Sequence, residues 1–474
     1  MNTNINETIF RQYDIRGIVG TELSPDTANL VGKAYGTYLL KKGLCGKAVT
    51  LGFDARLSSK SIEDAVSSGI TSTGIDVILL GLCTTPMLYF STHTMDVDGG
   101  IMITGSHNPP EYNGIKICIG QETIYGDEIQ KLKNIVLSGS FKKAGKRGIT
   151  EHCSIAEKYN SYLFLQFNHL LRLNEKRKNP LKVVIDAGNG TAGLIIPDLL
   201  KKLGCDVIPL FCSPDGNFPN HHPDPTIPEN LKCLIKTLKD NNADIGFAYD
   251  GDADRLGVIS DKGEIVWGDK ILYILAKSLL KSVPNAAIVS EVKCSQVMYD
   301  KIAELGGRAI MWKAGHSLIK SKMREEKALL AGEMSGHIFY AHNYFGFDDA
   351  IYASLRFIEV LLKEGKTVSE LLSDFPKTVS TPEIRVDCSE DKKFKIVEEL
   401  KKILKTYNGS EVEIKELITI DGVRAVFENG WGLLRASNTQ PALVMRFEAD
   451  SEENINKYQE FVNKLLKKTL NCKK

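Results

Sequence analysis

One pattern occurs three times in this chain: an apolar run, a glycine or polar turn, a helical stretch, and a glycine followed by a second apolar run. The three copies span residues 49–82, 181–211 and 287–312. Apolar runs of four to six residues are typical of strands buried on both faces, and the amphipathic segments between them are typical of crossover helices. Because a helix between two strands leaves them parallel, the pattern predicts three related α/β domains with mixed, mostly parallel sheets.

The pattern ends after Phe375, where two prolines bracket residues 377–381 and helices rich in Lys and Glu follow. A fourth, smaller α+β domain is expected there. A length of 474 residues suits three or four domains at ~150 residues each. Linker composition and strand endings place the predicted domains at 1–150, 151–262, 263–373 and 374–474.

Charge and cysteine content exclude several classes of protein. Sixty Lys and Arg face 59 Asp and Glu, so no net field attracts nucleic acid or an anionic membrane. The ten cysteines form no CxxC pair, as is typical of thiols in a reducing compartment. No apolar run reaches the ~18 residues of a membrane span, and the start lacks the features of a signal peptide. A cytoplasmic protein without nucleic-acid or membrane partners is expected.

The first chemical loop is TGSHNPPEYNGIK, residues 104–116, which follows a predicted buried strand. Ser106 is a candidate nucleophile, and Gly105 leaves room for a ligand to approach. His107 and Lys116 are close enough in sequence to accept its proton or supply a cation. The alternative is an ordinary turn in which Ser106 caps backbone donors.

The second loop is DGDADR, residues 250–255, directly after a predicted strand. In extended backbone Asp250, Asp252 and Asp254 project to one side and repel unless a cation joins them. Hard oxygen ligands without His or Cys favour Mg²⁺. The residues needed for a calcium EF-hand are absent, since Arg255 and Asp261 stand where that loop has Gly and Glu. A solvated acidic turn is the alternative.

The third loop is GEMSGH, residues 332–337. Glu333 and Ser335 alternate and could point together, offering a carboxylate and a hydroxyl to vicinal sugar hydroxyls. A glycine-bounded turn with a capping serine is the alternative.

The fourth loop is RASNTQP, residues 435–441. The Arg435 guanidinium, with Ser437, Asn438 and Thr439, could surround a dianionic phosphate. The alternative is a turn beside a surface arginine. Taken together, the four loops provide a hydroxyl with a metal and a separate anion site, so they suggest a phosphate moved within one molecule.

Longer motifs support a family resemblance. They are FRQYDIRG at 10–17, TGSHNPPEYNGIKI at 104–117, GNFPNHHPDP at 216–225, DGDADR at 250–255, MWKAGHSLIK at 311–320, GEMSGH at 332–337, GFDDAIY at 346–352 and RASNTQPALVMRFEA at 435–449. With them the chain resembles the α-D-phosphohexomutase superfamily, and within it the bacterial phosphomannomutase/phosphoglucomutase group, over nearly its whole length. The resemblance implies four domains around a central cleft, the last similar to a TATA-binding-protein-like unit.

The resemblance also implies roles for individual residues. Ser106 would be the phosphoserine and would complete, through one phosphoryl oxygen, the Mg²⁺ site of Asp250, Asp252 and Asp254. Arg255 and Lys116 would flank that phosphoryl group, and Arg16, Lys116 or His337 would transfer protons. The substrate-binding positions would be Tyr13, Lys293, His316, Glu333, Ser335, Arg435, Ser437, Asn438 and Thr439. Ala253 departs from the glycine found in many relatives, and alanine is tolerated there unless the position needs a positive φ.

The implied reaction interconverts hexose 1-phosphates and 6-phosphates of mannose and glucose through a 1,6-bisphosphate intermediate. It would use one Mg²⁺ ion, glucose 1,6-bisphosphate as activator, and hexose phosphates as partners, and it would supply nucleotide-sugar synthesis. Three alternatives remain open at this point: a phosphoglucosamine mutase, a metal-dependent phosphatase and a non-catalytic sugar-phosphate sensor. A monomer is favoured.

Overall fold

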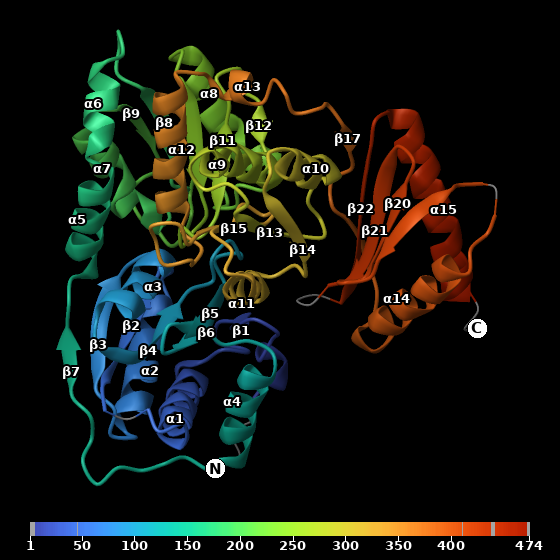
Figure 1. The fold of residues 1–474 in the computed structure, drawn as a ribbon. Coiled ribbons are helices and arrows are strands. Elements are labelled where there is room, and N and C mark those ends of the chain that lie inside the picture. Colours follow the sequence, from blue (N-terminus) through green and yellow to red (C-terminus); the bar gives the residue numbers. More distant parts are fainter. Residues whose placement is uncertain (1–4, 45, 410, 438–440, 472–474) are drawn as a thin grey trace. The chain divides into compact units, whose positions relative to one another are not determined.

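The structure is a computed structural model that describes residues 5–44, 46–409, 411–437 and 441–471. The chain forms two compact units. Unit 1 comprises Met1–Leu275 and Ser335–Leu371, and unit 2 comprises Ala276–Met334 and Leu372–Lys474. Figure 1 shows the helices and strands of both units.

The first sheet of unit 1 contains the first repeat and the Ser106 loop. Its strands are β1 (Ile15–Ile18), β2 (Ala48–Phe53), β3 (Val77–Leu82), β4 (Val97–Ile103), β5 (Tyr112–Ile119), β6 (Glu122–Thr123) and β7 (Thr150–His152). They are ordered β1-β5-β4-β2-β3-β7, with β6 on β5. β2 is parallel to β3 and β4, whereas β5 is antiparallel to β4 and β1, so this sheet is mixed.

Four helices belong to this sheet: α1 (Pro25–Lys41), α2 (Ser59–Thr71), α3 (Thr85–Thr94) and α4 (Asp127–Ser138). Helix α1 begins at Pro25 because the side chain of Ser24 accepts the backbone N–H of Thr27. Helices α1 and α2 pack closely at Gly32, where a Cβ would lie 2.3 Å from the carbonyl oxygen of Val66.

The second sheet of unit 1 contains the second repeat and the DGDADR loop. Its strands are β8 (Lys182–Asp186), β9 (Asp206–Leu210), β10 (Ile245–Tyr249), β11 (Leu256–Ile259) and β12 (Ile265–Val266), in the order β12-β11-β10-β8-β9. β8 is parallel to β9 and β10, and β10 is antiparallel to β11. The aspartate loop therefore connects two antiparallel neighbours, directly at the end of a fully buried strand.

The remaining elements of unit 1 are mainly helical. They are η1 (Glu7–Ile9), α5 (Ile155–Phe167), α6 (His169–Glu175), η2 (Thr191–Leu194), α7 (Ile196–Lys202), η3 (Pro228–Leu231), α8 (Lys232–Asp240), β16 (Ile338–Tyr340), α12 (Ala350–Glu364) and α13 (Val368–Leu371). Helix α9 (Gly268–Ser282) begins in unit 1 and ends in unit 2.

Asp349 fixes the start of α12 within unit 1. Its carboxylate accepts the backbone N–H of Tyr352 at 2.8 Å, which caps the helix. The hydroxyls of Tyr159 and Tyr344 donate to the same carboxylate at 2.8 and 2.7 Å. Burial raises the pKa of Asp349 to about 6.

Unit 2 contains the third repeat as β13 (Ala287–Glu291), α10 (Gln296–Glu304) and β14 (Arg308–Trp312). α11 (His316–Glu326) and β15 (Leu330–Gly332) follow. β13 lies between β14 and β15 and is parallel to both. The carboxyl ends of β13 and β15 therefore meet at one edge, which is where Glu291 and Glu333 lie.

The last sheet is antiparallel and belongs to unit 2. Its elements are β17 (Val379–Ser380), β18 (Ile384–Asp387), α14 (Glu390–Lys405), β19 (Ile414–Ile418), β20 (Val423–Phe427), β21 (Gly430–Ala436), β22 (Ala442–Ala449) and α15 (Glu452–Asn471). The strand order is β17-β22-β21-β20-β19, with β18 on β22. Helices α14 and α15 cover one face of the sheet (Figure 1).

Strand β21 shows how this sheet is used on both faces. Leu434 and Ala436 pack into the core formed with α14 and α15. The alternate residues Trp431 and Leu433 pack against Val292, which follows β13. One face thus holds the helices, and the other holds a loop of the preceding domain.

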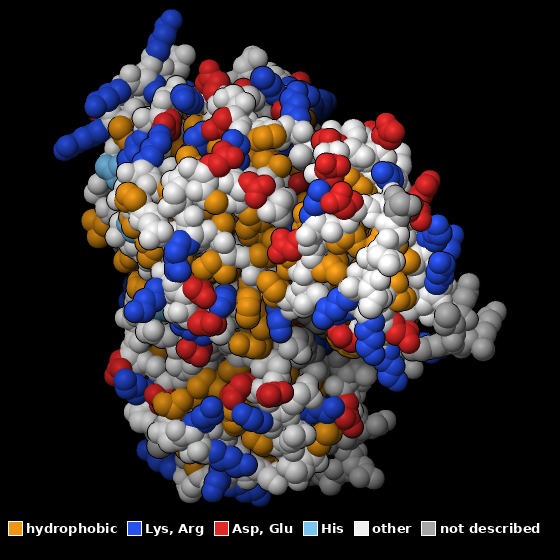
Figure 2. Space-filling view, turned by 45° about the vertical axis from the view of Figure 1, so that its right-hand side comes forward, with side chains coloured by type: hydrophobic (Ala, Val, Ile, Leu, Met, Phe, Trp, Pro, Cys, Tyr) orange, Lys and Arg blue, Asp and Glu red, His pale blue; other side chains and the backbone are white. Residues whose placement is uncertain are grey.

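The predicted fold class is confirmed: three related α/β domains precede an α+β domain. The predicted domain boundaries and the central cleft stay predictions. Positive and negative side chains are interspersed on the face shown in Figure 2, in keeping with the balanced composition. Within the described ranges, no helix is long and apolar enough to cross a membrane.

Candidate active site

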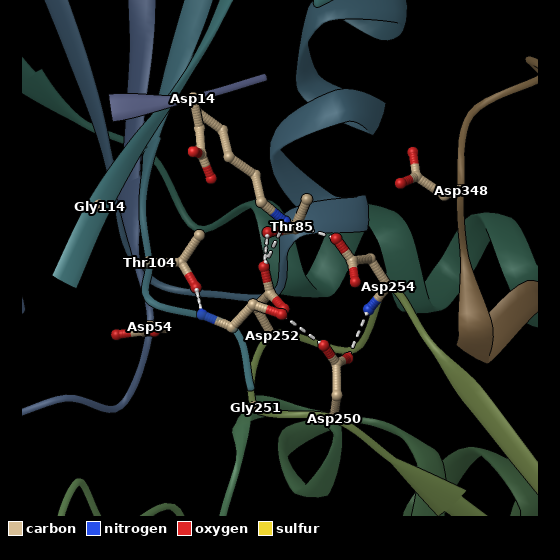
Figure 3. Close-up of polar contacts among 12 residues, drawn as sticks. Asp14, Asp54, Thr85, Thr104, Gly114, Asp250, Gly251, Asp252, Asp254 and Asp348 are labelled. Carbon is tan, nitrogen blue, oxygen red and sulfur yellow. Dashed lines mark hydrogen bonds and ion pairs between the residues drawn. The ribbon is translucent and has the colours of Figure 1, made fainter. Parts of the chain in front are cut away.

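Ser106 lies in the loop between β4 and β5 of unit 1. Its side chain is buried and its φ is 47°, which is unusual for a residue with a side chain. The backbone N–H donates to the Thr104 hydroxyl at 2.8 Å, and the Ser106 hydroxyl donates to Asp250 Oδ2 at 2.6 Å. Figure 3 shows these bonds. The loop therefore aims the serine hydroxyl at the aspartate loop.

Asp250, Asp252 and Asp254 are fully buried after β10. Each offers an oxygen within 4.8 Å of the others, as the alternating pattern predicts (Figure 3). Asp250 Oδ1 accepts the backbone N–H groups of Asp254 and Arg255 at 3.1 Å each. Burial and the charges of its two neighbours raise the pKa of Asp250 well above its usual range. Three buried carboxylates at this spacing call for a cation.

Lys116 and Thr85 donate hydrogen bonds to two of these aspartates, and Lys116 also offsets part of their negative charge. Lys116, on β5, donates to Asp252 Oδ2 at 2.7 Å and also to Asp254 Oδ2. The Thr85 hydroxyl donates to Asp252 Oδ2 at 2.6 Å. Burial alone would raise the pKa of Asp252, but the Lys116 ammonium holds that pKa below its usual range.

One lysine does not neutralise three aspartates. Asp252 Oδ1 and Asp254 Oδ1 are buried without a hydrogen-bond partner among the described residues. Carboxylate oxygens in this arrangement fit a hard divalent cation such as Mg²⁺, which would be held by the three aspartates. The buried oxygens thus agree with the metal predicted from the sequence.

Arg255 and His337 form a pair beside the aspartates. Arg255 Nε donates to His337 Nε2 at 3.0 Å, so the His337 ring carries its proton on Nδ1. His337 Nδ1 lies 3.2 Å from Asp348 Oδ2 and 3.6 Å from Asp254 Oδ1. Figure 3 shows Asp348 and Asp254 on different segments. The histidine is therefore oriented by groups on both sides of its ring.

Further predicted residues of unit 1 lie on the Ser106 loop or in and before strand β1. Arg16, on β1, donates to the Asn108 side chain at 2.6 Å and pairs with Asp14. His107 Nδ1 lies 3.2 Å from the Ser106 hydroxyl. Burial and the nearby Arg255 and Arg16 lower the pKa of His107, so its ring is neutral. Tyr13 lies partly buried just before β1.

The predicted binding residues of unit 2 begin at the end of β13. Lys293 Nζ lies 3.4 Å from Glu291 Oε1 and 3.4 Å from Glu383 Oε2. Burial alone would lower the pKa of Lys293, but these two carboxylates raise it above its usual range. Glu291 Oε1 also accepts the backbone N–H of Met334 at 3.0 Å. Glu291 therefore connects Lys293 to the GEMSGH segment.

Glu333 follows β15 and is buried. Its Oε1 accepts the backbone N–H of Gly315 at 2.6 Å, immediately before His316 starts α11. One oxygen of the predicted sugar-binding carboxylate is thus already used within the protein. The chain passes from unit 2 to unit 1 after Met334, so Ser335, which is partly buried, belongs to unit 1.

Arg435 lies on β21 and is oriented by Asp421. Its Nε and Nη2 both lie 3.0 Å from Asp421 Oδ2, which also accepts the backbone N–H of Ala314 at 3.1 Å. Ser437 is buried, and its N–H donates to the Ala442 carbonyl at 2.9 Å. Asn438 and Thr439, predicted for the same phosphate site, lie outside the described residues.

Reasoning from sequence missed several residues in these networks, among them Thr85, Glu291, Asp348 and Asp421. Asp348 stands in the GFDDAIY motif, which carried the family resemblance but no assigned role. Glu291 ends β13, and Thr85 and Asp421 follow strands, in segments without a distinctive composition. Only the tertiary contacts reveal them.

Two expectations about small residues need correction. Ala253 does take a positive φ, of 63°, so alanine is accepted here in a backbone conformation that favours glycine. Gly105 leaves room for Arg56 and not for a ligand, since a Cβ on Gly105 would lie 2.5 Å from the guanidinium carbon of Arg56.

Comparisons with known proteins agree with this organisation. Family models described as phosphoglucomutase/phosphomannomutase match four consecutive segments: α/β/α domain I at residues 7–143, domain II at 160–263, domain III at 267–379 and the C-terminal domain at 383–465.

Similar full-length proteins bear corresponding names. A phosphomannomutase/phosphoglucomutase of Pseudomonas aeruginosa is 44% identical over 97% of this chain and 96% of its own. A phosphoglucomutase of Neisseria gonorrhoeae is 44% identical over 96% of each chain. A crystal structure of a phosphoglucomutase/phosphomannomutase family protein from Burkholderia thailandensis has a TM-score of 0.90 and 40% identity, covering 98% of both chains. On its sequence, its domains and its fold, this chain belongs to the phosphoglucomutase/phosphomannomutase family.

Proposed function

We propose that this chain interconverts hexose 1-phosphates and hexose 6-phosphates of mannose and glucose by two phosphoryl transfers through Ser106. The observation that supports this most directly is the hydrogen bond from the Ser106 hydroxyl to Asp250, in a group of three fully buried aspartates. A hydroxyl fixed beside a cation site is suited to carry a phosphoryl group.

In the first half-reaction, phosphorylated Ser106 would donate its phosphoryl group to the free O1 or O6 hydroxyl of a bound hexose phosphate. The Ser106–O–P bond breaks, the sugar O–P bond forms, and the sugar proton leaves to a base. The Ser106 oxygen is left as an alkoxide. The bisphosphate then turns end for end, its other sugar O–P bond breaks as a new Ser106 O–P bond forms, and the base returns its proton to the sugar oxygen that is released. One bound Mg²⁺ would neutralise negative charge on the transferring group, and Lys116 and Arg255 would add positive charge.

His337 is the proposed proton acceptor, while Lys116 and Arg16, which carry protons, are candidates for proton donation. Its Nε2 accepts a hydrogen bond from Arg255, and its Nδ1 faces Asp348. To take the sugar proton on Nε2, His337 must first lose the Arg255 bond. We infer that Arg255 turns toward the phosphoryl group when substrate binds, which frees the histidine at the step that needs it.

The binding groups are proposed to divide between sugar and phosphate. Glu333 and Ser335 would bind the 3- and 4-hydroxyls, while Arg435, Ser437, Asn438 and Thr439 would bind the non-reacting phosphate. Lys293, His316 and Tyr13 would contact the substrate from other segments. Exchange of the two hydroxyls on rotation would allow both orientations and make the C2 configuration unimportant. We further propose glucose 1,6-bisphosphate as activator and a cytoplasmic monomer.

The aminosugar alternative is not favoured, because relatives with 44% identity carry the names phosphomannomutase/phosphoglucomutase or phosphoglucomutase. A coupled assay with mannose 1-phosphate and glucose 1-phosphate, Mg²⁺ and a trace of glucose 1,6-bisphosphate tests the proposal. Both 6-phosphates should form without release of inorganic phosphate. Stoichiometric phosphate release would indicate a phosphatase, and binding without isomer exchange would indicate a sensor.

A further inference from the structure

A buried arginine holds the backbone of the Ser106 loop. Arg56 follows β2, and its side chain is fully buried. Its two terminal nitrogens donate to four backbone carbonyls of one loop: Ser106 at 2.8 Å, Asn108, Pro109 at 2.6 Å and Tyr112 at 2.9 Å. A planar guanidinium has enough donors in a fixed geometry to do this, whereas a lysine ammonium has three at one point.

Asp54 fixes both the arginine and the start of the loop. Its Oδ2 accepts the backbone N–H of Gly105 at 3.1 Å and lies 3.3 Å from Arg56 Nε. Its Oδ1 accepts hydrogen bonds from the backbone N–H of Arg56 at 3.0 Å and from the Ser59 hydroxyl at 2.6 Å. In Figure 3, Asp54 and Asp250 approach the Ser106 loop from different segments. The hydrogen bonds of Asp54 and Arg56 thus hold the backbone of the loop, and a separate bond from the Ser106 hydroxyl joins the loop to Asp250.

The surroundings of Arg56 leave no space for substrate at the guanidinium. A Cβ on Gly105 would lie 2.5 Å from Arg56 Cζ and Nε, and one on Gly216 would lie 2.8 Å from Arg56 Cα. The Phe218 ring covers the guanidinium, with its centroid 5.3 Å from Cζ. Arg56 therefore does not contact substrate, and its hydrogen bonds reach the reaction through the loop that it binds.

The loop needs such a support because its own sequence resists this conformation. Ser106 has a φ of 47°, a left-handed conformation that is unfavourable for a residue with a side chain. Pro109 and Pro110 have no N–H groups, so they cannot close the loop by donating backbone hydrogen bonds. Donation from Arg56 replaces those bonds and fixes the carbonyl of Ser106 itself.

From these contacts we propose that Arg56 is the positioning residue of the phosphoryl-carrying loop, holding Ser106 in the backbone conformation that directs its hydroxyl to Asp250. This inference rests on the proposed function of Ser106. Loss of Arg56 should slow phosphoryl transfer without changing how the groups of unit 2 bind hexose phosphate.

The test compares Arg56→Met and Arg56→Lys with the wild-type protein. Each is incubated with glucose 1,6-bisphosphate and Mg²⁺, and phosphorylation of Ser106 is followed by intact mass. Arg56→Met should lower both this rate and kcat at least 100-fold, with the KM for mannose 1-phosphate within about threefold. Arg56→Lys should be intermediate, because it keeps the charge but not the four bonds. A uniform structural defect would change KM as well.

Arg147→Met is the matched control. This exposed arginine of the same domain also donates to a backbone carbonyl, that of Ser68, but lies outside the Ser106 loop. In the Arg147→Met protein, Ser106 should be phosphorylated at the wild-type rate. Gly105→Ala supplies a second variant, since its methyl group displaces the guanidinium while all donors remain; it should slow phosphorylation at least tenfold.

Two outcomes would overturn the inference. One is a folded Arg56→Met protein in which Ser106 is phosphorylated at the wild-type rate. If Arg56→Met does not fold, wild-type rates in both Arg56→Lys and Gly105→Ala would overturn it equally. Absence of phosphorylation in the wild-type protein would contradict the proposed function itself, which separates the two failures.

Discussion

The two units of the molecule use buried charge differently. In unit 1, Asp250, Asp252 and Asp254 converge on each other around one ammonium, that of Lys116, and two of their oxygens lack hydrogen-bond partners among the described residues. In unit 2, acids and bases alternate: Lys293 lies between Glu291 and Glu383, and Arg435 pairs with Asp421. The groups of unit 1 are therefore suited to binding a cation and to phosphoryl transfer, and those of unit 2 are suited to recognising the substrate.

Both units nevertheless use the same device to hold a loop. Arg56 binds four carbonyls of the Ser106 loop in unit 1. In unit 2, the fully buried Arg424 donates to the carbonyls of Val292 at 2.7 Å and Cys294 at 2.9 Å, next to Lys293. Its guanidinium carbon lies 3.8 Å from the centroid of the Trp431 ring. The comparison predicts that changes in the Ser106 and aspartate loops of unit 1 alter kcat, whereas changes at the binding groups of unit 2 alter KM.

The largest effect is expected for Ser106→Ala. Without the hydroxyl, kcat should fall at least about 1,000-fold, as for loss of other catalytic nucleophiles. The dissociation constant for glucose 6-phosphate should change little, because the proposed binding groups remain. Coupled kinetics and calorimetric titration measure the two quantities. Ser138→Ala, on α4 of the same domain, is the control. Equal losses in binding and turnover would contradict the division between the units.

The next effect concerns Glu291 and pH. Burial, reinforced by Glu333 although Lys293 opposes it, raises the pKa of Glu291 to about 7. Because the folded pKa lies above that of the unfolded chain, the stability from this group is present below pH ~4.3 and is lost as the pH rises through 7. The loss should amount to roughly 4 kcal/mol.

Glu291→Gln removes this dependence, so its unfolding free energy relative to wild type should rise between pH 5 and pH 8. Chemical denaturation at both pH values, followed by tryptophan fluorescence, measures it. The exposed Glu304→Gln, also in unit 2, should show no such trend. Parallel pH curves for Glu291→Gln and the wild type would rule out the assigned pKa shift.

A smaller effect is expected for Arg435→Lys. An ammonium cannot reproduce the two contacts of the guanidinium with Asp421, each 3.0 Å, while also binding phosphate. KM should rise about tenfold, equivalent to ~1.4 kcal/mol, with kcat nearly unchanged. Steady-state kinetics test this against Arg308→Lys, an exposed arginine on β14. A fall in kcat alone would assign Arg435 to the chemistry instead.

The smallest effect should follow from Ala253→Gly. Glycine relieves the positive φ but loses a buried methyl group, so the free energy of unfolding should change by less than about 1 kcal/mol. Activity should remain within twofold. Ala253→Val should be clearly destabilised, since a β-branched residue is strained in this conformation. Thermal unfolding and the coupled assay compare the three proteins; a stable, active valine variant would contradict the assignment of strain.

The fold could be predicted from sequence largely because the repeats carry it. In each repeat the apolar runs became the parallel strand pair, from β2-α2-β3 to β13-α10-β14. The antiparallel partners β5 and β11 were less evident. Each follows a chemical loop, whose glycines and prolines give the same signal whether the chain reverses direction or crosses over.

The site divides in the same way. Side-chain alternation predicted that the three aspartates converge, because it is a local property of extended backbone. Local pattern could not bring Lys116 to those aspartates, since 136 residues separate it from Asp252, and only the family resemblance placed it near their site. It also assigned the space at Gly105 to a ligand, because the arginine that fills it comes from another strand end.

The φ of 47° at Ser106 also bears on the identity of the residue. A threonine hydroxyl can also act as a nucleophile, and it does so in other enzymes. Its branched Cβ, however, is disfavoured in left-handed backbone. The main chain thus selects the primary alcohol over the secondary one at this position, before any difference in their reactivity is considered.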